Sequence, residues 1–98
     1  MNVVGLIEGS DASLKSEYVV FTAHLDHLGK GAPVNGDGIY NGAFDNATGT
    51  AIMLETARYF ASLERKPRRS LLFIAVTAEE KGLLGSDYFA RQPTVPRE

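Results

Sequence analysis

Five polar side chains could share one chemical task, because each stands where an apolar run gives way to a loop. They are His24, Asp26, Asp45, Glu79 and Glu80. Imidazole nitrogen and carboxylate oxygen suit zinc, with cobalt or manganese as substitutes, and the chain has no cysteine to supply a thiolate. We therefore predict a metal site with His24, Asp45 and Glu80 as its ligands.

The two remaining carboxylates are predicted to support that site. Consecutive side chains point apart in an extended or turning segment, so Glu80 can bind a metal while Glu79 faces the water that the metal activates. Glu79 is the predicted general base, because a base needs a carboxylate that is free of metal. Asp26 stands two residues after His24. It is predicted to accept the other ring N–H of that imidazole and so to fix its tautomer.

A strand, a helix and a second strand must bring these residues together. Residues 18–23 and 70–78 are continuous apolar runs rich in β-branched and aromatic residues, which is typical of strands covered on both faces. Between them, apolar residues recur at helical spacing from Asn46 or Thr48 until the chain nears Pro67. Such a unit makes its strands parallel, and ligands gather beyond the carboxyl ends of parallel strands.

The other segments complete the predicted α/β fold, a mixed, mainly parallel sheet with flanking helices. A β-rich run over residues 2–8 predicts a further strand, and residues 86–91 predict a short helix. Residues 29–42 contain five glycines and show no periodicity. We therefore expect a loop there that can fold over or under the site.

Composition limits the classes of partner. With 98 residues, 44% of them hydrophobic, the chain is predicted to form at most one domain. Its formal net charge of -2 provides no field that would attract nucleic acid or an acidic membrane. The N-terminus has no basic segment and only a short apolar run, so neither a signal peptide nor a membrane span is predicted. A solvated turn is predicted for the basic group Arg65, Lys66, Arg68 and Arg69.

Three segments resemble the successive signatures of zinc-dependent aminopeptidases, the family of bacterial leucyl aminopeptidases and of the peptidase domain of glutamate carboxypeptidase II. They are YVVFTAHLDHLG at 18–29, GAFDNATGTA at 42–51 and FIAVTAEEKGLLGS at 73–86. The resemblance implies a three-layer sandwich with two zinc ions, in which His24 binds one ion, Glu80 binds the other and Asp45 bridges both. It also implies that Glu79 is the general base and that N-terminal peptide bonds are hydrolysed.

The family pattern extends beyond this sequence. Its site is completed by a further aspartate and a further histidine, downstream of the last strand and helix predicted here. The resemblance therefore implies that residues 1–98 are an N-terminal portion of a catalytic domain, with an incomplete site. A truncated sheet would leave an open edge, and a second copy of the chain is one partner that could pair with it. Phe44 stands where relatives often have an aspartate, at a position that is not a ligand.

Two other functions remain open at this point. A glutaminyl cyclase shares the fold and a similar ligand arrangement but cyclises an N-terminal glutamine with one zinc ion, although residues 45–49 are more similar to the peptidases. A non-catalytic module would keep the fold for protein binding. His27 either lines the site or contacts substrate, or it faces solvent or stabilises the loop. The compartment is also open, and relatives are commonly exported, which is compatible with secretion or a periplasmic location.

Overall fold

Three strands form the central sheet, in the order β1-β5-β2. The computed structural model describes residues 1–96. β1 (Val3–Ile7) is antiparallel to β5 (Ser70–Val76), whereas β2 (Tyr18–His24) is parallel to β5. The sheet is therefore mixed, and its parallel pair is the one that the sequence predicts.

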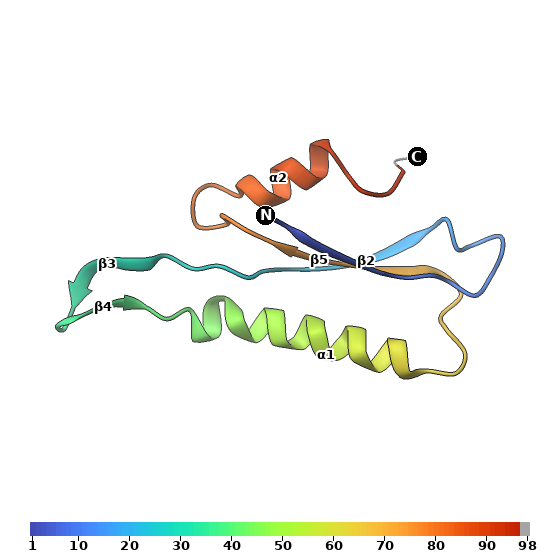
Figure 1. Cartoon of the computed structure of the whole chain (residues 1–98), viewed down its shortest axis with the longest axis horizontal. Coiled ribbons are helices and arrows are strands. Elements are labelled where there is room, and N and C mark those ends of the chain that lie inside the picture. Colours follow the sequence, from blue (N-terminus) through green and yellow to red (C-terminus); the bar gives the residue numbers. More distant parts are fainter. Residues whose placement is uncertain (97–98) are drawn as a thin grey trace.

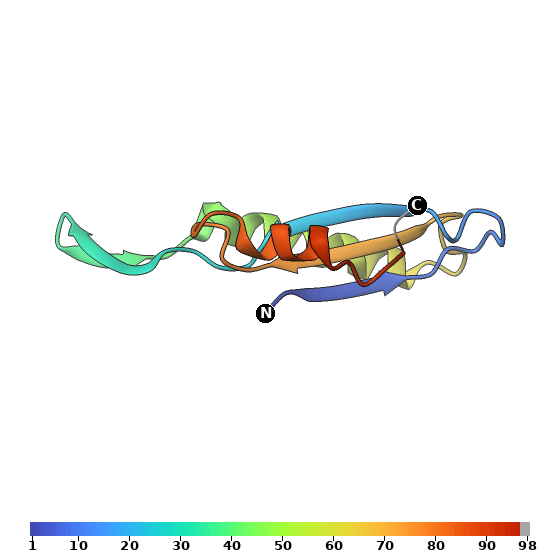
Figure 2. The same ribbon diagram turned by 90° about the horizontal axis from the view of Figure 1, so that it is seen from above.

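One helix covers each face of the sheet, so the fold has three layers (Figure 1). α1 (Gly49–Ser62) connects β2 to β5 along one face, and α2 (Leu84–Arg91) follows β5 on the other. Figure 2, seen from the α2 side, shows that helix lying over β5. Neither helix has the length and apolar character that crossing a membrane requires, within the residues described. The predicted α/β sandwich is confirmed.

β5 lies at the centre of the core because side chains on both of its faces are buried. On one face, Leu71 and Phe73 pack against Met53 of α1. On the other face, Leu72 is only 1% exposed and belongs to a cluster that packs against Phe89 of α2. The buried centre of the domain thus ends directly before the turn that carries the two glutamates.

β2 is less covered than its apolar sequence predicts. Val19 and Val20 are 43% and 51% exposed. Within residues 1–96, β2 pairs only with β5. The prediction of a strand covered on both faces is therefore confirmed for β5, which lies between two strands, and wrong for β2, which lies at the edge of the sheet.

Residues 29–42 also differ from their prediction. They contain two short strands, β3 (Gly29–Val34) and β4 (Asp37–Tyr40), which form an antiparallel hairpin. The hairpin turns at Asn35 and Gly36, both with positive φ, and it extends away from the sheet (Figure 1). Its tip therefore lies away from the strand ends, and only its base is close to them.

Candidate metal centre

The carboxyl ends of β2 and β5 lie side by side, as their parallel register requires. The last pair in register is His24 opposite Val76, and the Leu25 N–H donates a hydrogen bond of 3.0 Å to the Val76 carbonyl. The segment with Asp26 and His27 therefore leaves the sheet beside the segment that carries the two glutamates.

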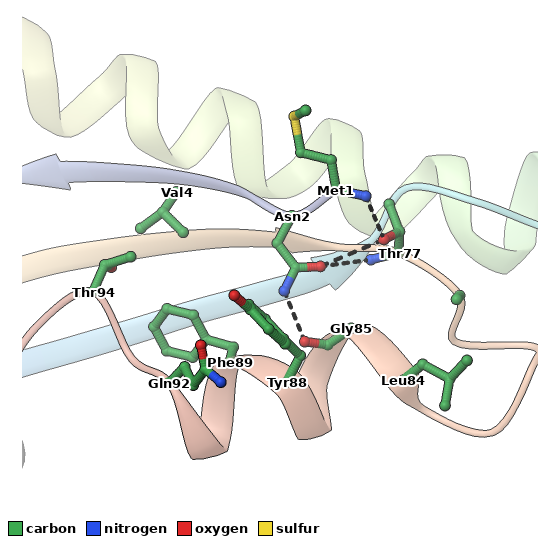
Figure 3. A pocket seen from close by; sticks show the side chains of 11 residues that line it. Met1, Asn2, Val4, Thr77, Leu84, Gly85, Tyr88, Phe89, Gln92 and Thr94 are labelled. Carbon is green, nitrogen blue, oxygen red and sulfur yellow. Dashed lines mark hydrogen bonds between the residues drawn. The ribbon is translucent and has the colours of Figure 1, made fainter.

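A short turn holds Glu79 and Glu80 at the end of β5. The side chain of Asn2 joins the two ends of this turn, at Thr77 and Gly85 (Figure 3). Asn2 accepts a hydrogen bond of 3.1 Å from the Thr77 N–H and donates one of 2.7 Å to the Gly85 carbonyl. Any side chain at Gly85 would collide with the backbone of Thr77. The close contact between Thr77 and Gly85 thus keeps both glutamates at the strand end.

Asp45 reaches the same end of the sheet from the segment before α1. This segment, η1 (Ala43–Thr48), is an irregular turn in which Asp45 and Asn46 have non-helical backbone angles and are joined by a cis peptide bond. The Thr50 hydroxyl donates a hydrogen bond of 3.0 Å to the His24 carbonyl. This bond ties the start of α1 to the end of β2 and holds Asp45 close to His24.

His24 lies between two acceptors. Its Nδ1 is 3.0 Å from the backbone carbonyl oxygen of Asp26, and its Nε2 is 2.9 Å from Oδ1 of Asp45. The His24 side chain is 11% exposed. A carbonyl can only accept, so the Nδ1–H donates to Asp26, and Nε2 faces the Asp45 carboxylate, which when ionised can likewise only accept. Histidines that bind a metal through Nε2 are oriented in this way by a hydrogen bond from Nδ1.

The pKa of His24 is raised above the ordinary histidine value. Burial of the ring acts to lower the pKa, but the Asp26 carbonyl and the negative charges of Glu79 and Asp45 outweigh burial. The surroundings of Nε2 therefore favour positive charge, whether a proton or a cation supplies it.

Asp26 is arranged differently from its prediction. Its backbone carbonyl accepts the hydrogen bond from His24, while its carboxylate Oδ1 lies 3.9 Å from Nδ1. This Oδ1 is buried and has no hydrogen-bond partner among the residues described. Such an atom is a free acceptor that can bind a hydrogen-bond donor or a positive charge.

His27 belongs to a group of three possible ligands. One ligand atom each from His27, Asp45 and Glu80 lies within 4.8 Å of the other two. His27 Nδ1 is also 2.7 Å from Glu80 Oε1. The sequence left its role open, and its place three residues after His24 is the signal that could have singled it out.

The structure brings the predicted residues to one end of the sheet, with Asp45 in the middle. Asp45 contacts His24 and forms a group with Glu80, although His24 is not a member of that group. Glu79 is half-buried, and its carboxylate makes no hydrogen bond or ion pair within residues 1–96. Its charge nevertheless acts on His24, so it lies near the same centre.

A pocket of about 490 Å³ lies beside the glutamate turn, between the N-terminal residues and α2 (Figure 3). Its walls include the side chains of Val4, Tyr88 and Phe89. None of the predicted site residues lines it. We therefore assign the chemistry to the polar residues at the carboxyl ends of β2 and β5 and not to this pocket.

Comparison with known proteins connects this arrangement to a family. The sequence profile of peptidase family M28 matches residues 2–98. The chain belongs to peptidase family M28. Aminopeptidase NAALADL1 of Rattus norvegicus is 36% identical to the M28 chain over 95 residues, covering 93% of the chain and 11% of that protein. A probable zinc metalloprotease of Pyrenophora teres f. teres is 36% identical over 89 residues, covering 91% of the chain and 18% of that protein.

A solved structure supports the same relationship for the M28 chain. The zinc aminopeptidase BSAP of Bacillus subtilis is similar with a TM-score of 0.68 and 34% sequence identity, over 95% of the M28 chain and 20% of BSAP. The three-layer fold of the M28 chain is thus found in a zinc aminopeptidase. The M28 chain spans 11% to 20% of the length of these three proteins.

Proposed function

We propose that this chain contributes a two-zinc site to a peptidase, with His24 and Asp45 at one ion and Glu80 and Asp45 at the other. The position of Asp45 carries the proposal, because its carboxylate lies 2.9 Å from His24 and also groups with Glu80. A carboxylate has two oxygens, so one residue can bridge two ions about 3.5 to 4 Å apart. The side chain of Asp45 is 64% exposed and is accessible to ions from solvent.

The chemistry of the donor set fits zinc. Imidazole nitrogens and carboxylate oxygens are its usual ligands when thiolates are absent. The carboxylates at this end, those of Asp26, Asp45, Glu79 and Glu80, form no ion pair with lysine or arginine within residues 1–96. Bound cations would balance this negative charge, and the buried Oδ1 of Asp26, which has no hydrogen-bond partner in the described residues, supports the same conclusion.

Glu79 is the proposed general base. Zinc, when bound, would polarise the scissile carbonyl and lower the pKa of a water molecule. The Glu79 carboxylate would take the proton from the attacking water and deliver it to the amine nitrogen of the leaving peptide. Its half-buried position near His24, with no hydrogen bond or ion pair in the described residues, leaves it available for both transfers.

Asp26 has a supporting role in this proposal. Its backbone carbonyl accepts the hydrogen bond from the Nδ1–H of His24 and so keeps Nε2 directed toward Asp45. Its carboxylate, 3.9 Å from Nδ1, adds negative charge that favours a cation at Nε2.

The proposed substrate is a peptide with a free N-terminus. This choice rests on family membership and on relatives that are named as aminopeptidases or zinc metalloproteases. In this proposal the scissile peptide bond follows the first residue of the substrate; zinc, when bound, would polarise its carbonyl, and Glu79 would move the proton of the attacking water.

The test is a comparison of two substrates with the protein that carries residues 1–98, before and after removal of zinc. We expect zinc-dependent release of the N-terminal residue from an aminoacyl anilide and no cyclisation of a glutaminyl peptide. Cyclisation without hydrolysis would replace the peptidase proposal with a cyclase. Zinc binding with neither reaction would indicate a non-catalytic module.

A further inference from the structure

The two histidines of this chain contact the carboxylates through different nitrogens. His24 turns Nε2 toward Asp45 and uses Nδ1 for a backbone carbonyl. His27 instead has its Nδ1 2.7 Å from Oε1 of Glu80. This difference suggests that the two imidazoles have different tasks, although they are only three residues apart.

The contact between His27 and Glu80 has one chemical interpretation. An ionised carboxylate has no proton to donate, so Nδ1 of His27 must be the donor and Oε1 the acceptor. A distance of 2.7 Å is that of a charge-assisted hydrogen bond. The bond engages one oxygen of Glu80 and leaves the other available to a ligand.

The surroundings of both side chains favour a fixed geometry. His27 and Glu80 are 21% and 20% exposed, so protein covers most of each side chain. Gly42 approaches the Cβ of His27 so closely that an added Cβ would lie 2.7 Å from it. The ring of Tyr40 lies 6.4 Å from the imidazole, centroid to centroid. The base of the β3–β4 hairpin therefore packs against His27 from the side.

We propose that His27 is a positioning residue, which holds the Glu80 carboxylate through its Nδ1–H and so orients the free oxygen for metal binding. The inference rests on the proposed function, in which Glu80 is a metal ligand. A ligating carboxylate that is held by a second hydrogen bond loses less freedom when it binds, and such partners change metal affinity by about 10- to 100-fold. His27 would thereby connect the hairpin base and the end of β5.

Three substitutions separate positioning from ligation and from packing. The side-chain nitrogen of asparagine can take the place of Nδ1, whereas that of glutamine takes the place of Nε2, and alanine has neither. We expect His27→Ala and His27→Gln to weaken zinc binding by about 10- to 100-fold. His27→Asn should bind zinc nearly as tightly as the unaltered chain. Affinity is measured by competition with a chromophoric chelator.

The result for His27→Asn decides the proposal. Equal losses in all three variants would overturn it, since an amide nitrogen cannot replace an imidazole as a ligand and asparagine does not fill the same volume. Unchanged affinity in all three variants would also overturn it, because Glu80 would then need no partner. Cobalt substitution provides a second readout, since the visible spectrum of bound cobalt should be the same in His27→Asn as in the unaltered chain.

A measurement on the zinc-free chain keeps this inference separable from the proposed function. At a pH where His27 is neutral, long-range proton–nitrogen NMR should show its proton on Nδ1, and Glu80→Ala should return it to Nε2, the tautomer that a free imidazole side chain prefers. A proton on Nε2 in the unaltered chain would overturn the inference even if zinc binds. Absence of zinc binding alone would contradict the proposed function, and the tautomer would still decide the role of His27.

Discussion

The two ends of the β2–β5 pair carry charged residues in opposite arrangements. At the amino end, Arg68 pairs with Asp11 at 2.9 Å and Arg69 pairs with Glu17 at 2.6 Å. At the carboxyl end, the carboxylates that form an ion pair within residues 1–96 do so with histidines and with no lysine or arginine. The same types of acidic side chain are thus balanced at one end and unbalanced at the other.

The buried polar groups show the same contrast. At the amino end, Ser70 is 1% exposed, and its hydroxyl accepts from the Gly9 N–H and donates to the Lys15 carbonyl. At the carboxyl end, Oδ1 of Asp26 is buried without a hydrogen-bond partner in the described residues, 3.9 Å from Nδ1 of His24. A polar group whose partners lie within the chain serves stability, whereas one that lacks a partner is available for a ligand. The amino end therefore stabilises the fold, and we interpret the carboxyl end as a cation site.

The largest expected effect concerns the general base. Glu79→Gln removes the proton acceptor and should lower kcat for zinc-dependent hydrolysis by about 10²- to 10⁴-fold, while the zinc content stays the same. The matched control is Glu17→Gln at the amino end, whose carboxylate pairs with Arg69. If both variants retain full activity, Glu79 is not the base and the contrast between the ends has no catalytic meaning.

At the amino end, Ser70→Ala should affect stability and leave zinc binding intact. It leaves the Gly9 N–H without its acceptor, which should lower the free energy of unfolding by about 1 to 3 kcal/mol in urea titrations. Ser62→Ala is the control, because that exposed hydroxyl bonds only within its own helix, to the Tyr59 carbonyl. A loss of zinc affinity in Ser70→Ala would show that the two ends are not independent.

The two ends should respond to opposite changes of pH in the zinc-free protein. The hydrogen bond from Arg68 is the main cause of the lowered pKa of Asp11. The Asp11 carboxylate therefore stabilises the folded state above the ordinary aspartate pKa, and this contribution is lost as the pH falls through the lowered pKa. The pKa of His24 is raised, so the contribution of His24 to stability depends on pH in the opposite direction. Its contribution is complete below about pH 6.5 and is lost as the pH rises through the raised value.

Urea unfolding with a chelator present, repeated across the pH range, measures both contributions. Asp11→Asn should flatten the acidic part of the stability profile and leave the part above neutral pH unchanged. His24→Gln should flatten the part of the stability profile above neutral pH and leave the acidic part unchanged. A variant that changes the acidic part and the part above neutral pH equally would show that the substituted side chain affects both ends of the β2–β5 pair.

The smallest expected effect is self-association at the edge of the sheet, which we propose because β2 has no second neighbour within residues 1–96. The apparent mass in sedimentation equilibrium should rise with protein concentration. Val20→Lys, at a half-exposed position of β2, should reduce the rise, because charge on an edge strand opposes pairing. A constant monomer mass at every concentration would exclude this association.

Much of the fold could be predicted because hydrophobic periodicity specifies β2, α1 and β5 independently of their surroundings. The β3–β4 hairpin could not, since residues 29–40 are rich in glycine and show no alternation of apolar and polar residues. α1 begins at Gly49 with Thr48 as its N-cap residue, so of the two predicted starting points Thr48 and not Asn46 opens the helix. The Asn46 side chain accepts the Gly49 N–H at 2.9 Å, and its own backbone is not helical.

The elements that carry the site could also be predicted, because ligands gather at the carboxyl ends of parallel strands. The individual contacts could not. Whether Asp26 meets His24 through its carbonyl or its carboxylate depends on how the chain turns after β2. The contact of His27 with Glu80 joins residues 53 positions apart, and no spacing in the sequence predicts it.

The central claim is that the unbalanced carboxylates at the end of the β2–β5 pair bind zinc. Equilibrium dialysis with elemental analysis, on the unaltered chain and on Asp45→Ala and Asp11→Ala, tests it most directly. We predict about one to two zinc ions per chain in the unaltered protein and in Asp11→Ala, with loss of tightly bound zinc in Asp45→Ala. Equal zinc content in all three proteins, or negligible zinc in the unaltered chain, would contradict the claim.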